Sequence, residues 1–224
     1  MGVSFPAGTI VRTGAERATL VRRTYSLVFV SILFTVAGAM FALSQPSILG
    51  AVAAHPWLSM LAAFAPLFLV MRARDVFPAN IALVLLFTFA MGVIISPALF
   101  IYGQQQPGLI TQSAVTTIGA FGVLTAYAFI SRRDFSAWGS FFIVGVWVVI
   151  GSSILNFFFF KNSAFDVAIS AVTVLVFSGL LVFDTWRIRN VYGPDEYVGA
   201  AVNIYLDLLN MFMAILRIFG GRRN

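Results

Sequence analysis

The amino-acid sequence predicts an all-α integral membrane protein, a bundle of seven transmembrane helices. Of its 224 residues, 60% are hydrophobic and only 10% are charged, whereas about 25% of the residues of a soluble domain are charged. Charges and clusters of proline and glycine divide the chain into apolar runs of about 20 residues, the length that a helix needs to cross a bilayer. The runs do not alternate between polar and apolar residues, which excludes the strands of a membrane barrel.

The apolar runs follow one another through short connections, with no inserted soluble domain. A basic tail, residues 1–24, precedes the first run, whose full spanning length indicates a retained helix rather than a cleaved signal peptide. We therefore expect a cytoplasmic tail and, over residues 25–224, a single transmembrane domain. The predicted helices cover residues 25–43, 52–71, 79–101, 110–130, 136–158, 165–186 and 197–218.

The basic residues indicate the orientation of the helices, because cytoplasmic loops are enriched in Lys and Arg. A cytoplasmic N-terminus leaves only Lys161 in an outer loop. Arg217, Arg222 and Arg223 follow the seventh run, which either spans the membrane or enters it and returns. The Arg-rich, Cys-free composition favours a bacterial inner membrane. The basic residues expected on the inner side are Arg12, Arg17, Arg22, Arg23, Arg72, Arg74, Arg132, Arg133, Arg187 and Arg189.

Two acidic residues, Asp184 and Asp207, lie at membrane depth in the sixth and seventh runs. An ionisable side chain in a bilayer costs roughly 2.5–3.5 kcal/mol, so both are expected to face the interior of the bundle. The two runs are joined by a short loop and are therefore expected to be antiparallel neighbours. Two carboxylates in a low-dielectric site do not ionise together readily, so the pair is expected to share a proton or a divalent cation.

Asp207 belongs to a stripe of polar or small residues on the predicted seventh helix, because the steps between them are four, three, four and three. The stripe indicates that this helix faces other helices or a wet path rather than lipid. Arg72, which closes the second run at the inner side, is the candidate counter-charge for Asp184, although an anchor at the cytoplasmic surface also explains it. The stripe consists of Asn203, Asp207, Asn210, Ala214 and Arg217.

The composition excludes several classes of function. The chain has no cysteine and a single histidine, so it has no disulfide framework, no Cys-based metal site and no multi-His site. No motif of an enzyme or of a cofactor site is present, and we expect neither catalysis nor a cofactor. The net charge of +6 is attributed to topology and lipid contact rather than nucleic acid. The expected partners are calcium ions, protons, the lipid bilayer and other membrane proteins.

Three stretches, "VMRARD", "LLVFDTWRI" and "AAVNIYLDLLNMFMAILRIFG", resemble the Bax inhibitor family, the transmembrane Bax-inhibitor-motif proteins, in a bacterial-type form. The resemblance implies a bundle in which the C-terminal helix is central and wrapped by the other six. It also implies a pH-sensitive calcium leak, with Asp184 and Asp207 as pH sensor and ion site. In that picture Arg72 is a latch, whose pairing with ionised Asp184 helps to hold the pore shut.

Three functions fit these residues. The first is a pH-sensitive calcium leak channel, in which the Asp pair binds the ion or a proton. The second is a proton-coupled cation exchanger. The third is a membrane scaffold or stress modulator that binds other membrane proteins, in which the pair is only a hydrogen-bonded link between helices, a contact of about 0.6 kcal/mol in membranes.

Overall fold

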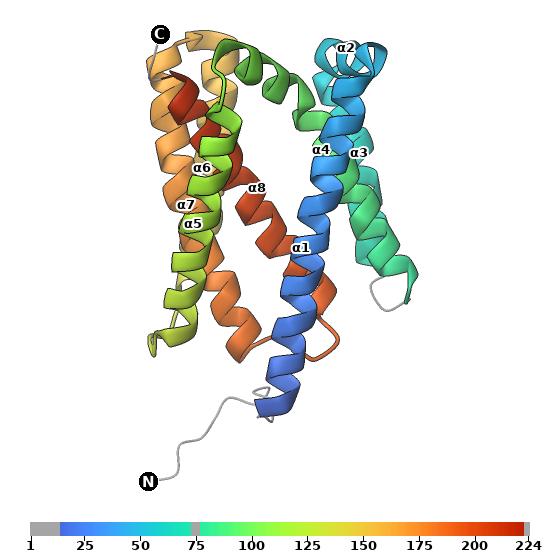
Figure 1. Ribbon diagram of the computed structural model, residues 1–224. Coiled ribbons are helices and arrows are strands. Elements are labelled where there is room, and N and C mark those ends of the chain that lie inside the picture. The colour runs from blue at the N-terminus through green and yellow to red at the C-terminus, as the bar shows by residue number, and fades with distance from the viewer. Residues whose placement is uncertain (1–13, 73–76, 222–224) are drawn as a thin grey trace.

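The computed structural model describes residues 14–72 and 77–221, apart from the side chains of residues 70–72, and every regular element in these ranges is a helix (Figure 1). Six helices are long and apolar enough to cross a membrane, and the bent pair α2 and α3 supplies a seventh crossing if it counts as one span. The prediction of an all-α, multi-pass membrane protein is confirmed. The elements are α1 (Gly14–Ser44), α2 (Pro46–Ala54), α3 (Pro56–Arg72), α4 (Ala79–Gln105), α5 (Leu109–Ile130), α6 (Trp138–Leu155), the π-helical turn η1 (Asn156–Phe160), α7 (Ser163–Asn190) and α8 (Tyr197–Gly221).

The second predicted run, residues 52–71, is wrong as a single helix. The structure divides this part of the chain into α2 and α3, which are bent by 102° at His55. Pro56 is the first residue of α3, and a residue that precedes proline is pushed out of helical geometry. The break therefore follows from the His55-Pro56 step, which lies inside the apolar run.

Helix α1 begins at Gly14, well before the predicted start at residue 25, so the second half of the expected tail is helical. Arg17, Arg22 and Arg23 thus lie on α1 rather than in a loop. Four further basic residues of the predicted topology lie outside the described residues, at positions Arg12, Arg74, Arg222 and Arg223.

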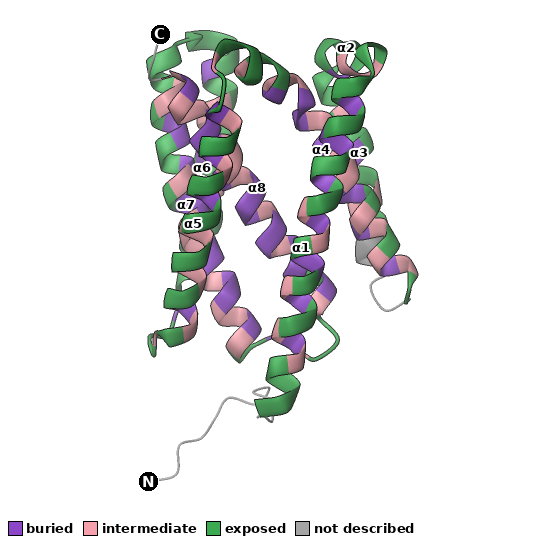
Figure 2. Cartoon of the chain, viewed as in Figure 1, coloured by how far each residue is buried: buried purple, intermediate pink, exposed green. Residues whose placement is uncertain are grey.

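Helix α8 is the centre of the bundle and crosses diagonally between two groups of helices, α1 to α4 on one side and α5 to α7 on the other (Figure 1). It packs against α1, α4, α5 and α7. From Ala200 to Gly221, every residue of α8 is buried or partly buried, whereas the outer helices keep exposed faces (Figure 2). The expectation of a central C-terminal helix is confirmed.

Helix α8 passes through the whole bundle. We call the end of the bundle at which α1 begins the basal end, and the opposite end the distal end (Figure 1). At the basal end, the Arg23 guanidinium of α1 lies 5.7 Å from the centroid of the Tyr197 ring. At the distal end, Gly220 lies against the Tyr102 ring of α4. The seventh segment is one uninterrupted helix that runs from the basal to the distal end of the bundle rather than one that enters and returns, and Arg217 lies in its distal part.

Helices α1 and α4 approach each other closely at two glycines. A Cβ atom on Gly38 would clash with the backbone carbonyl of Phe89, and one on Gly92 would clash with that of Thr35. The Thr35 hydroxyl donates a hydrogen bond of 3.0 Å to the Thr88 carbonyl across the same crossing. In lipid, where apolar surface gains little by associating, small residues of this kind allow helices to pack.

We predict that Gly92→Ala destabilises the bundle, because the added methyl group forces α1 and α4 apart at a backbone contact. The expected loss is about 1–3 kcal/mol, the usual cost of overpacking, seen as a lower midpoint of thermal unfolding in detergent. The matched control is Gly119→Ala, since Gly119 is an exposed α5 residue with open space around its Cβ position. Equal midpoints for the two variants would contradict the packing described above.

Candidate functional site

The two membrane-depth carboxylates lie on packed, antiparallel neighbours, α7 and α8. Only 6% of the Asp184 surface and 4% of the Asp207 surface is exposed. The negative charge of Asp184 acts on Asp207 across the helix interface. The structure therefore brings the predicted pair together inside the bundle, while the role of the pair as ion site and pH sensor stays a prediction.

Helix α7 is fixed at both ends, which positions Asp184. At its start, the Asn162 side chain accepts hydrogen bonds from the backbone N–H groups of Ala164 at 2.9 Å and Phe165 at 3.1 Å, as a helix N-cap does. Near its end, Arg189 Nη1 donates to the carbonyl oxygens of Phe129 and Ser131, each at 2.8 Å. These carbonyls belong to the end of α5, so Arg189 ties the last turn of α7 to α5.

Arg187 is the charged partner of Asp184 among the described residues. Its Nη1 atom donates to Asp184 Oδ1 at 3.1 Å, within one turn of α7. The guanidinium also lies over the Tyr192 ring, 4.5 Å from the centroid, a favourable cation–π arrangement. From the sequence alone, Arg187 is only a marker of topology. The signal that could have assigned it to the site is the spacing of Asp and Arg by three residues on a helix.

Tyr192, in the loop between α7 and α8, links the Asp184–Arg187 pair to the central helix. Its hydroxyl accepts a hydrogen bond from Asn203 Nδ2 of α8 at 2.9 Å. Burial, followed by the negative charge of Asp184, raises the pKa of Tyr192 to about 12, so the phenol is neutral at physiological pH. Tyr192 is not predicted from the sequence, because a lone tyrosine in a polar loop forms no pattern.

The carboxylate of Asp207 has fewer hydrogen-bond partners than that of Asp184 among the described residues. Its Oδ2 atom is buried and has no hydrogen-bond partner among the described residues. A buried polar atom without a partner is costly, and such atoms in proteins commonly bind a water, an ion or a proton. Asp207 therefore has a buried carboxylate oxygen without a described hydrogen-bond partner, whereas the charge of Asp184 is balanced by Arg187.

The polar stripe of α8 does not form one continuous polar path. Asn210 Nδ2 donates to the Leu206 carbonyl of its own helix at 2.8 Å. Distal to Asp207, the apolar side chains of Met211 and Leu216 are fully buried. Of the stripe residues, Asn203 and Asp207 lie in the basal half of α8, and Asn210 is hydrogen-bonded within its own helix.

The predicted latch, Arg72, is the last residue of α3, and its side chain lies outside the described residues. Its pairing with Asp184 stays a prediction. In the described part of the chain, the arginine that forms an ion pair with Asp184 is Arg187.

The described part of the chain contains no larger cluster of metal-ligating side chains around Asp184 and Asp207. Over residues 14–72 and 77–221, no cluster of three or more His, Asp or Glu side chains forms a metal site. A calcium ion takes 6–8 oxygen ligands, more than the carboxylates of Asp184 and Asp207 supply.

The chain resembles proteins of eukaryotes and bacteria along most of its length. A family model described as "Inhibitor of apoptosis-promoting Bax1" matches residues 17–224. Bax inhibitor 1 of Schizosaccharomyces pombe is 32% identical over 216 residues, which cover 93% of this chain and 78% of the relative. Protein lifeguard 4 of Mus musculus is 26% identical, covering 90% of this chain and 84% of the relative. An uncharacterized membrane protein of Vibrio cholerae is 32% identical, covering 93% of this chain and 92% of the relative.

We predict that Arg187→Ala destabilises the protein by about 1–3 kcal/mol, because it leaves the buried Asp184 carboxylate without its donor. Adding Asp184→Asn should recover part of this loss, since the uncompensated charge is then removed. The measurement is a double-variant cycle of thermal unfolding midpoints in detergent, with Arg133→Ala as the control at an exposed arginine. Strictly additive effects of the two substitutions would show that the pair does not interact.

Proposed function

This chain belongs to the Bax inhibitor family of membrane proteins, and from this premise we propose that it lets calcium ions leak across the membrane in a pH-sensitive manner. Asp184 and Asp207 form the site at which the ion binds during passage. Calcium is the cargo in this proposal, and the chain needs neither a catalytic centre nor a cofactor.

The observation that carries the proposal is the unpartnered Oδ2 atom of Asp207, buried beside a second carboxylate. Two kinds of occupant compensate such an atom, a proton or a cation. Because both bind the same oxygens, protons compete with the cation, and a leak through this site depends on pH. A structural link between helices would instead be expected to satisfy its polar atoms with one another.

Arg187 supports a closed state of the leak. It pairs with Asp184 at 3.1 Å within α7, and its contact with the Tyr192 ring leads on through Asn203 to α8. Distal to the pair, Met211 and Leu216 are fully buried, so an ion passes only when α8 separates from its neighbours. Protonation or cation binding at the carboxylates weakens the Asp184–Arg187 pair and favours that separation.

We predict that Asp207→Asn abolishes the pH dependence of calcium flux and changes its rate several-fold. The protein is reconstituted into liposomes that contain a calcium dye, and dye fluorescence is followed across a series of pH values. Asp195→Asn is the matched control, because Asp195 is an exposed acid in the loop between α7 and α8. Flux through Asp207→Asn that matches the wild type at every pH would rule out the assigned site.

Two further outcomes identify the other functions. A proton gradient that forms in proportion to calcium flux, measured with a second dye, identifies a proton-coupled exchanger. No flux in the wild type, together with a lower unfolding midpoint for Asp207→Asn, identifies a scaffold in which the pair only joins α7 to α8.

We also propose that the basal end faces the cytoplasm of a bacterial inner membrane. Arginines gather at that end, on the start of α1, in the connection between α5 and α6, and on the last turn of α7, as the positive-inside rule requires.

The chain has no cysteine, so single cysteines report topology cleanly. We predict that an impermeant maleimide added to right-side-out vesicles labels Ser163→Cys at the distal end and not Ser136→Cys at the basal end. The reverse pattern would invert the orientation.

A further inference from the structure

A groove on the surface of the bundle exposes the central helix between α1 and α5. The two helices meet at the basal end, where the Tyr25 ring of α1 lies 6.1 Å from the Phe121 ring and 6.2 Å from the Phe129 ring of α5. Farther toward the distal end, α8 is visible between them (Figure 1). The groove is therefore closed at its basal end and open at the side.

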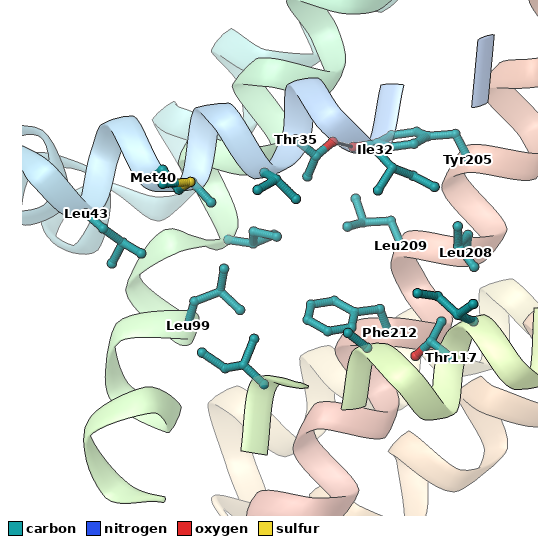
Figure 3. Close-up of a pocket in the computed structure, with 16 residues that line it drawn as sticks. Ile32, Thr35, Met40, Leu43, Leu99, Thr117, Tyr205, Leu208, Leu209 and Phe212 are labelled. Atoms are coloured by element: carbon teal, nitrogen blue, oxygen red, sulfur yellow. Dashed lines mark hydrogen bonds between the residues drawn. The ribbon is translucent and has the colours of Figure 1, made fainter. Parts of the chain in front are cut away.

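The groove has a volume of about 340 Å³ and apolar walls. Helix α8 forms its floor with Leu208 and Phe212, while Met40 of α1 and Leu99 of α4 point into it from the other side (Figure 3). Ala114 completes the wall on α5. Met40 is 66% exposed, which marks the rim as open to the surroundings of the bundle.

The hydroxyl groups at the groove are already engaged. The Thr35 hydroxyl lies 2.7 Å from the Tyr205 hydroxyl, and the Thr117 hydroxyl donates to the Ser113 carbonyl at 2.7 Å. With these groups satisfied within the protein, the groove offers hydrocarbon surface to its occupant. Water or a polar ligand would find few partners there.

The length and position of the groove match one leaflet of a bilayer. Along α1 its lining runs from Ile32 to Leu43, a rise of about 16 Å in a helix. That is about half of the roughly 30 Å hydrocarbon layer. Because Leu43 is next to the distal end of α1, the groove lies in the distal half of the membrane.

We propose that one acyl chain of a phospholipid from the distal leaflet occupies this groove and contacts α8 at Leu208 and Phe212. The walls, α1 and α5, are both membrane spans, so bilayer hydrocarbon surrounds the rim. The acyl chain is thus the occupant that fits the surroundings and the length of the groove, and its presence does not depend on the calcium leak.

The test is photolabelling of the full chain in bilayers. The wild-type protein is reconstituted with phosphatidylglycerol that carries a diazirine on one acyl chain, irradiated and digested, and the adducts are located by mass spectrometry. We predict adducts on Leu208 or Phe212 and on the exposed Trp147 of α6, but not on Met211, which is fully buried on α8. Labelling of α6 without labelling of α8, or equal labelling of Met211, would overturn the proposal.

A groove-filling variant supplies the matched comparison. Ala114→Trp fills the groove, whereas Ala126→Trp places the same side chain on an exposed position of the same helix. Adducts on α8 are expected to fall several-fold in Ala114→Trp and to be unchanged in Ala126→Trp, relative to the adducts on α6. If Ala114→Trp does not fold, the smaller Ala114→Leu takes its place. Unchanged labelling of α8 in a folded filling variant would also overturn the proposal.

Discussion

The carboxylate of Asp207 on the central helix is the constraint on which the rest of the bundle depends. A charged or polar oxygen at this depth is costly against lipid, so α8 must be surrounded by protein. The outer helices meet that demand, since from Ala200 onward no α8 residue is exposed. The same enclosure removes water from around Asp207 and leaves its Oδ2 atom without a partner in the described part of the chain. The Asp207 carboxylate thus requires the outer helices around α8, and the same helices keep water away from it.

A chain of polar and charged contacts near Asp207 connects α7, the loop after it and α8. Asp184 is compensated by Arg187, Arg187 lies over the ring of Tyr192, and Tyr192 accepts a hydrogen bond from Asn203 of α8. A change of charge at the carboxylates therefore acts on contacts that join α7, the connecting loop and α8. This continuity gives the proposed leak a physical route from protonation to helix movement.

Packing around α8 is uneven. On the α4 side, Gly38 and Gly92 let α1 and α4 approach at backbone distance, which closes the bundle tightly. On the α5 side, the contacts of Tyr25 close only the basal end, and the groove above them reaches α8. The central helix is therefore enclosed by protein around the carboxylates and lines an open groove farther along, which is the arrangement expected if lipid completes its packing.

The sequence by itself determined the membrane class, six of the seven predicted spanning segments and the two acids at membrane depth, because apolar length and isolated charges are local properties that a chain carries without its fold. Even the division of the second run at His55 and Pro56 was present as a local signal, although the apolar pattern around it concealed the break. Only the tertiary structure decided that α8 runs through the whole bundle and that one oxygen of Asp207 lacks a described hydrogen-bond partner. It also decided that Arg187 pairs with Asp184 and lies over the Tyr192 ring. Partners and burial depend on which helix faces which, and residues far apart in the chain, such as Tyr25 and Phe121 or Thr35 and Tyr205, meet only when the whole bundle has packed.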